Sequence, residues 1–337
     1  MNKKMTGLFA LILAILFSSS DVDALSLNEN GKYLNYYGIE ITEQQLENLT
    51  NLGFTEEQIE IMEQGEFDNN KNLLGEIVSQ ETVYYKNTYV YTNPDFITYS
   101  TSENENYIVY SEEVTEEEYY NAPIDDAAGI TPYGLINGST TTEYKQLTST
   151  IVAVNNRYRL KADMSWRKMP KVRYKELFTL TMDNWVSLAP NTIQTKQIAT
   201  RNNPCDKITE RLTSNPLTTK QTPDGYAVSF KLPTDSTCQY VMETTLGPVT
   251  KTQEKPVNSI SSYIYYEINP STSPIKTLNA YADYAHGTKT ISIDPTVTLG
   301  LDSQGKIGAS ITFTGSYGDK FDSMATAHAA LTGINWT

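Results

Sequence analysis

The chain has 337 residues, of which 39% are hydrophobic and 11% aromatic, and its net charge is −14. Such a chain has enough apolar residues to bury a sizeable core, which excludes a wholly disordered protein. The acidic balance disfavours nucleic acid as a partner, because phosphates would repel the chain. Two histidines and two cysteines are few for a metal centre, so no cofactor and no metal are expected.

Residues 1–24 have the features of a secretory signal peptide. Two lysines precede the apolar run Leu8–Phe17, which is too short to cross a bilayer as a helix, and a small-x-small pattern ends at Ala24. We expect cleavage after Ala24 and a protein that is secreted, extracellular or loosely associated with the cell surface. An uncleaved interfacial anchor is the alternative. No later segment is apolar enough to predict a transmembrane span.

Charge is distributed unevenly along the chain. Residues 25–130 hold 22 acidic and 3 basic side chains, whereas residues 131–337 hold 16 acidic and 21 basic ones. This asymmetry predicts two modules with different partners, or an acidic segment that folds against a basic one. A solvated acidic surface that promotes solubility fits the same pattern.

A helical hairpin is predicted for residues 42–64, within a module of residues 25–75. Thr42 caps a run in which leucines recur at three-residue steps, and Gly53 ends that run in a left-handed conformation. The sequence T-E-E-Q from Thr55 is a capping box that begins a second helix, which we expect Gly65 to end. The apolar stripe of the hairpin is typical of a core face.

The next segment, residues 76–138, is acidic and rich in tyrosine. Its tyrosines and threonines between residues 82 and 110 favour β-structure, and an acidic run follows at residues 112–118. The passage at 121–138 is rich in Pro, Gly and Asp, a composition typical of a linker. We therefore expect a domain boundary before residue 139.

Residues 139–337 show the period-two alternation of half-buried strands. The pattern is clearest at residues 158–166, 226–232, 260–268 and 307–313, and turn signals separate these segments. No long helical pattern lies between them, which indicates antiparallel pairing. The predicted fold class is mainly β, with an antiparallel β-sandwich-like C-terminal domain and a small α-helical N-terminal module.

The order of these segments resembles that of uncharacterised secreted proteins of Gram-positive bacteria. In those proteins a Tyr-Gly segment (Tyr37–Ile39), a helical hairpin with the motif L-G-F-T-E-E-x-I and a Tyr-rich stretch (Thr82–Tyr91) follow the signal peptide. The likeness extends to the W-x-K-M-P-K-V-R segment at Trp166–Arg173 and to the C-terminal residues Thr326–Trp336. The resemblance implies this architecture and secretion, and it implies no particular function.

Cys205 and Cys238 are the two cysteines of the chain. Export would place them where thiols oxidise, and two cysteines allow one pairing within the chain. We therefore predict a Cys205–Cys238 disulfide, which would stabilise the fold by about 3–4 kcal/mol in the chain-entropy model.

The usual signatures of hydrolases and nucleotide-binding proteins are absent from the sequence. One enzymatic alternative is a spatial triad of His286, a hydroxyl residue, and Asp283 or Asp294. A paired-carboxylate glycosidase is a second enzymatic option. His328 lies in a run of small residues, which favours a packed or surface position. No residue is assigned a catalytic role.

Basic side chains concentrate between residues 157 and 175, where Asp163 is the one acid. Arg157, Arg159 and Lys161 would share one face of a strand. The candidate binding residues surround the turn at Pro170 and are Arg167, Lys168, Lys171, Arg173 and Lys175. They suit an anionic cell-envelope polymer or the acidic N-terminal segment of the chain itself, and the alternative is a solvated strand face with a basic turn.

These observations favour a secreted, non-enzymatic binding or surface-associated protein that contacts an envelope or host polymer. Two alternatives remain open. One is a secreted hydrolase that uses His286 and carboxylates. The other is a pore-forming protein, in which the Ser/Thr-alternating stretches Thr288–Thr298 and Ser310–Gly315 form a membrane hairpin.

Overall fold

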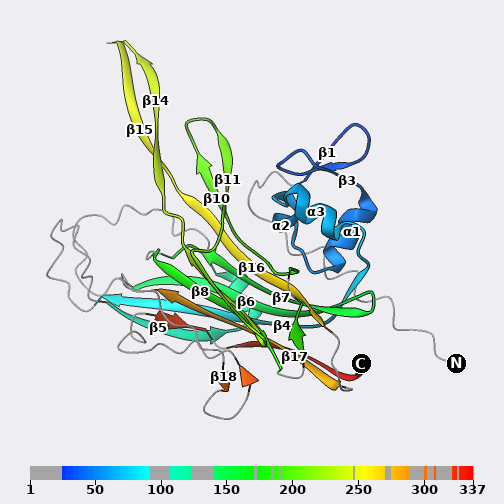
Figure 1. Ribbon diagram of the computed structural model, residues 1–337. Coiled ribbons are helices and arrows are strands. Elements are labelled where there is room, and N and C mark those ends of the chain that lie inside the picture. The colour runs from blue at the N-terminus through cyan, green and yellow to red at the C-terminus, as the bar shows by residue number, and fades with distance from the viewer. Residues whose placement is uncertain are drawn as a thin grey trace.

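The computed structural model describes most of the chain after residue 24, and most of the described strands form two large antiparallel sheets (Figure 1). The predicted mainly-β fold class is confirmed. The described residues are 25–91, 107–122, 140–170, 173–183, 186–189, 191–245, 247–269, 275–287, 300–301, 307–308, 321–324 and 326–336.

The first sheet has the strand order β11-β10-β16-β7-β6-β4-β5, and the short strand β9 pairs with β16. Its strands are β4 (Gly75–Tyr91), β5 (Tyr107–Val114), β6 (Thr140–Val154), β7 (Arg157–Lys168), β9 (Ser187–Leu188), β10 (Gln194–Asn203), β11 (Ile208–Ser214) and β16 (Val257–Asn269). β4 and β5, from the Tyr-rich segment 76–138, are thus hydrogen-bonded into the same sheet as β6 and β7. The boundary predicted before residue 139 does not separate two sheets, and residues 123–139 lie outside the described residues.

The second sheet has the order β12-β13-β8-β17-β20, and β21 also pairs with β17. Its strands are β8 (Lys175–Met182), β12 (Thr218–Thr222), β13 (Gly225–Lys231), β17 (Ile275–Gly287), β20 (Phe321–Ser323) and β21 (Ala327–Trp336). Inward-facing apolar residues of both sheets form one buried core. Leu160 and Met164 of β7, at alternating positions that the sequence predicts, share that core with Phe178 and Leu180 of β8.

Three smaller sheets complete the β-structure of the described residues. One holds β1 (Ser26–Leu27), β2 (Tyr33–Leu34) and β3 (Glu40–Ile41), another pairs β18 (Gly300–Leu301) with β19 (Ile307–Gly308), and the third is the hairpin of β14 (Ser236–Thr244) and β15 (Gly247–Lys255). The β14–β15 hairpin extends well beyond the two large sheets (Figure 1).

The predicted helical hairpin is present, and a third helix follows it. The helices are α1 (Glu43–Asn51), α2 (Glu56–Glu60) and α3 (Gln64–Asn70). Thr42 and Thr55 each form a capping box, and Gly53 has φ +85°, as predicted. The prediction that Gly65 ends the second helix is wrong, because the chain leaves helical geometry at Ile61 and Gly65 lies inside α3.

The helical module covers part of the outer face of the first sheet and forms a third layer there (Figure 1). Phe54 of the module packs edge-on against Tyr265 of β16, with ring centroids 5.3 Å apart. This packing corrects the expectation of a solvated charged face on β7 for two of its three bases, while Arg157 stays exposed. Arg159 and Lys161 are buried beneath the module, where Arg159 donates to Asn70. No helix among the described residues is long and apolar enough to cross a membrane.

Candidate functional site

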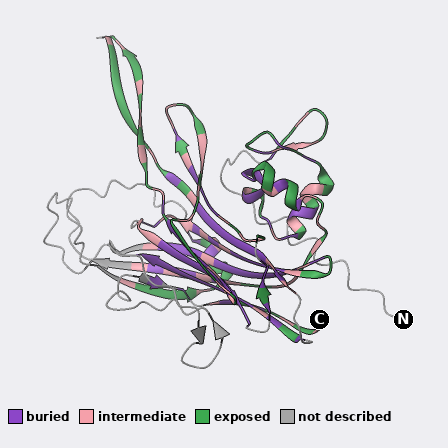
Figure 2. Ribbon diagram, in the orientation of Figure 1, coloured by how far each residue is buried: buried purple, intermediate pink, exposed green. Residues whose placement is uncertain are grey.

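The β14–β15 hairpin is exposed along most of its length (Figure 2). Its two strands pair with each other from Ser236 opposite Lys255 to Thr244 opposite Gly247, and with no other described strand. Near the tip, Val241 is 63%, Met242 36% and Val249 44% exposed. The hairpin therefore presents aliphatic side chains to solvent far from the core.

The pairing register decides on which face of the hairpin these side chains lie. Residues directly opposite each other share a face in an antiparallel ladder. Met242 opposes Val249 on one face, and Val241 opposes Thr250 on the other. Both faces near the tip consequently carry exposed apolar groups.

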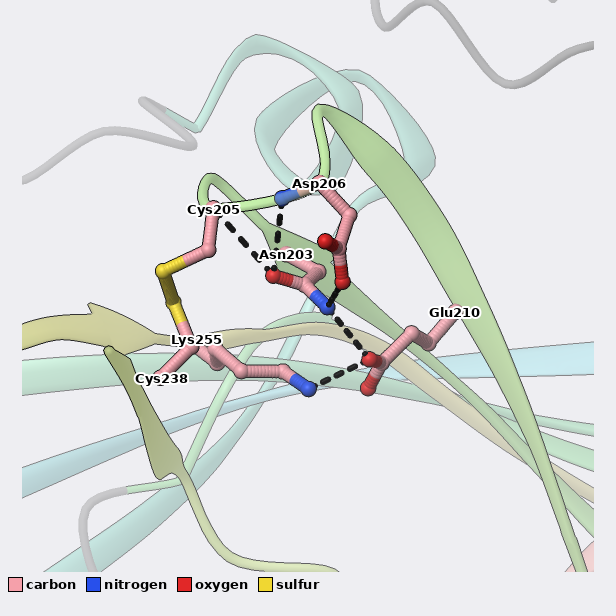
Figure 3. Close-up of a disulfide and its surroundings, with 6 residues drawn as sticks. All are labelled: Asn203, Cys205, Asp206, Glu210, Cys238 and Lys255. Carbon is pink, nitrogen blue, oxygen red and sulfur yellow. Dashed lines mark hydrogen bonds and ion pairs between the residues drawn. A yellow bond between two sulfur atoms is a disulfide. The ribbon is translucent and has the colours of Figure 1, made fainter. Parts of the chain in front are cut away.

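A disulfide fixes the base of the hairpin to the turn between β10 and β11 (Figure 3). Cys205 of that turn and Cys238 of β14 are bonded, with Cα atoms 6.2 Å apart, which confirms the predicted pairing. The side chain of Asn203 accepts from the backbone N–H of Cys205 and donates to Glu210 at 2.7 Å. Glu210 in turn pairs with Lys255 at the end of β15.

These contacts have a clear structural role. An isolated two-stranded hairpin is marginally stable in water, because it buries little apolar surface. The disulfide and the Asn203–Glu210–Lys255 interactions stabilise the hairpin at its base, because its tip packs little against other described residues. The fold thus holds an apolar tip in solvent instead of burying it.

The basic residues predicted as a binding patch are largely engaged within the chain. Arg167 donates to the backbone carbonyls of Tyr120 and Ala122, at the end of helix α4 (Glu116–Asn121). Arg173 pairs with Asp235 at 2.8 Å. Lys168 and Lys175 also have partners within the chain, and Lys171 lies outside the described residues.

Acidic residues of the helical module do meet bases of the first sheet, but not those of the predicted cluster. Glu60 pairs with Arg211, and Lys196 lies 3.3 Å from Glu63 and 3.7 Å from Glu66. These acids recur every three residues along the chain and face the sheet. The opposite charges of the two halves therefore meet in part at the interface between module and sheet.

A second cluster of charged groups lies buried between the two sheets. It includes Glu143 and Lys145 of β6, Glu176 of β8, His286 of β17 and Asp322 of β20. His286 Nδ1 lies 2.6 Å from Glu176 Oε1, and Lys145 pairs with Asp322. The ring of Trp166 packs against His286, with centroids 5.0 Å apart.

The surroundings shift the pKa values of this cluster. Burial raises the pKa of Glu176, and the His286 charge offsets this only in part. Burial alone would lower the pKa of His286, but the charge and hydrogen bond of Glu176, together with the charge of Glu143, make the net shift upward. Burial likewise opposes ionisation of Asp322, yet Lys145 and hydrogen bonds keep the pKa of that carboxyl low. Burial therefore favours the protonated form of Glu176, and the contact with Glu176 favours the protonated form of His286.

The partner of His286 differs from the one that sequence considerations offered. Asp283 bonds to Thr179 and Thr326 instead, and Asp294 lies outside the described residues. His286 has no exposed surface, so a substrate would need a rearrangement of the sandwich to reach it. His328 stacks on Tyr281, with ring centroids 4.5 Å apart.

Sequence reasoning missed Lys145, Glu176 and Asp322 as a group. A signal was present for Glu176, because it shares the inward register of Phe178 and Leu180 on β8. A charged residue at an inward position of a strand indicates a buried polar interaction. The strand pairing that brings the three together was not available from the pattern alone.

No group of His, Cys, Asp and Glu side chains in the described part of the chain is arranged to hold a metal ion. No family model matches the chain, and no curated protein matches it either.

Proposed function

We propose that this protein is secreted and acts without catalysis as a binding protein, and that the β14–β15 hairpin contacts a lipid membrane surface. The observation that carries the proposal is the exposed apolar tip formed by Val241, Met242 and Val249. Aliphatic groups held in solvent on a braced projection favour contact with an apolar phase.

Charge supports a lipid surface as the partner. Between Cys238 and Gln253 the hairpin has one acid, Glu243, and one base, Lys251, in a chain whose net charge is −14. The tip is thus close to neutral and is not repelled by anionic headgroups. Shallow contact also leaves the unpaired edges of the two strands among headgroups and water, where their backbone groups stay solvated.

The proposed location agrees with the signal-like sequence at residues 1–24 and with the Cys205–Cys238 disulfide, which suits an oxidising compartment. The segment order supports an origin among secreted proteins of Gram-positive bacteria. N-terminal sequencing of protein from the culture medium should begin at Leu25. Protein retained in the cytoplasm with residues 1–24 attached would contradict secretion.

Vesicle binding tests the contact directly. Mature protein should float with vesicles of phosphatidylcholine and phosphatidylglycerol, and the triple variant V241S/M242S/V249S should lose at least about tenfold in affinity, because burying each aliphatic side chain contributes roughly 1 kcal/mol. The matched control is I208S/L217S, which removes two exposed aliphatic groups outside the hairpin. This control should bind as the unchanged protein does.

Two results would contradict the proposal: no flotation of the unchanged protein, or equal flotation of the triple variant. Dye release from the same vesicles separates surface contact from pore formation. The stretches predicted for a membrane hairpin, Thr288–Thr298 and Ser310–Gly315, lie outside the described residues. Surface contact alone predicts binding without dye release.

A further inference from the structure

Lys145 and Asp322 meet inside the sandwich and bridge its two sheets. Lys145 belongs to β6 of the first sheet and Asp322 to β20 of the second. The Lys145 side chain is fully buried, and its Nζ lies 5.4 Å from the ring centre of Trp166 and 5.7 Å from that of Tyr284. An amine and a carboxyl group are thus in contact where aromatic rings exclude water.

The energetics of this location favour a neutral product over an ion pair. Removing an ammonium and a carboxylate from water costs free energy that their attraction offsets only in part. An amide at the same place carries no net charge. The free amine is the nucleophilic form of lysine, so the reaction needs a base that takes a proton from the ammonium group.

We infer that Lys145 and Asp322 become joined by an isopeptide bond, which makes this pair a self-modification site. Lys145 Nζ attacks Asp322 Cγ, a C–N bond forms and one C–O bond breaks. The released oxygen leaves as water. Of the three ammonium hydrogens, one stays on the amide nitrogen and two leave with the oxygen. An ammonium and a carboxylate therefore give an amide and water, and no oxidant or reductant is required.

Neighbouring groups assist the two stages of this reaction. Asn87 donates to one carboxyl oxygen of Asp322 and Ser111 to the other, so both hold the acceptor and stabilise the negative charge that develops on attack. Glu176 belongs to the same cluster, since His286 on β17 lies opposite Glu176 on β8 and opposite Asp322 on β20, and we assign it the proton transfer. Its pKa is raised chiefly by burial, and it is also shifted by the charges of Lys145 and Asp322. It accepts a proton from the amine and returns one to the departing oxygen.

The bond would change the connectivity of the fold. Lys145 and Asp322 are 177 residues apart in the sequence, so the link would close most of the β-sandwich into one covalent loop. It would fasten the C-terminal strands to the first sheet. This inference does not depend on the hairpin or on membrane contact.

Intact mass of the mature protein, denatured and with its disulfide reduced, tests the bond. The measured mass should be lower than the mass calculated from the sequence by one water molecule. Lys145→Arg keeps the positive charge but should show the full sequence mass, as should Asp322→Ala. Glu176→Gln should give a mixture in which the lighter species accumulates more slowly. A protease digest should yield one branched peptide that joins residues of β6 and β20.

The full sequence mass in the unchanged protein, even after prolonged incubation in the folded state, would overturn the inference. Loss of water that persists in Lys145→Arg would also overturn it, because the site would then lie elsewhere. The decisive mass is that of the unchanged protein, so the test does not rely on the folding of any variant.

Discussion

Asp283 shows how its place in the fold sets the chemistry of a single residue. Burial raises the pKa of this carboxyl from 3.8 to about 7, and hydrogen bonds from Thr326 and Thr179 only reduce the shift. The pKa of Asp283 is higher in the folded state than in the unfolded state. At pH values between the two, the folded state therefore binds a proton that the unfolded state does not. Stability therefore falls as pH rises from about 4 to about 7, and it stays lower above that range.

Asp283→Asn should remove this dependence. The amide is neutral at every pH and can accept the same hydroxyl hydrogen bonds, so the variant should be more stable than the unchanged protein by roughly 4 kcal/mol at pH 8 and by about 1–2 kcal/mol at pH 5. Urea unfolding at the two pH values measures the difference. The exposed Glu117→Gln serves as the control. An equal effect of Asp283→Asn at both pH values would refute the assignment.

The β14–β15 hairpin is the element whose shape depends most on a few contacts. Its strands bury almost nothing, and Cys205–Cys238 with the surrounding polar network holds its base (Figure 3). Its geometry is thus determined by cross-links and not by a core. Loss of these cross-links should free the hairpin before it affects the sandwich.

Replacing both Cys205 and Cys238 with Ser should leave the sandwich folded and loosen the hairpin. The free energy of unfolding should fall by about 3–4 kcal/mol in the chain-entropy model for a loop of this size. Trypsin should cut faster after Lys251 in the variant, as mass spectrometry of early fragments would show. The unchanged protein treated with a reductant is the matched control. Equal cleavage rates with and without the disulfide would contradict a bracing role.

At the scale of the whole molecule, the helical module and the β-sandwich form one packed unit. A shared apolar cluster joins module residues such as Phe54 and Ile59 to Ile198, Tyr263 and Tyr265 of the first sheet. Ion pairs and hydrogen bonds surround this cluster. The module therefore covers a sheet face that would otherwise expose both apolar and charged groups.

Phe54→Ala should destabilise the sandwich as well as the module. Removing a buried phenylalanine typically costs about 3–5 kcal/mol. Residues 25–75 contain no tryptophan, so tryptophan fluorescence reports on the rest of the chain. The urea concentration at the midpoint of the fluorescence change should fall. The midpoint of the helical circular dichroism signal should fall with it. A fluorescence midpoint that stays unchanged would show that the module unfolds independently. Leu27→Ala, at a largely exposed position, is the control.

The sequence alone determined features that depend on local chemistry. The alternation of apolar and polar residues predicted the strands that contain Trp166 and Phe230. Capping residues predicted the start of the first two helices, and the presence of two cysteines predicted the disulfide. The tertiary structure alone decided which strands pair and which face is covered. It buried Arg159 beneath the helical module and brought Lys145 to Asp322 across 177 residues of sequence. The local sequence pattern determines the periodicity of strands and the ends of helices. The contacts above depend on how strands distant in sequence pair, and no short stretch of sequence encodes that pairing.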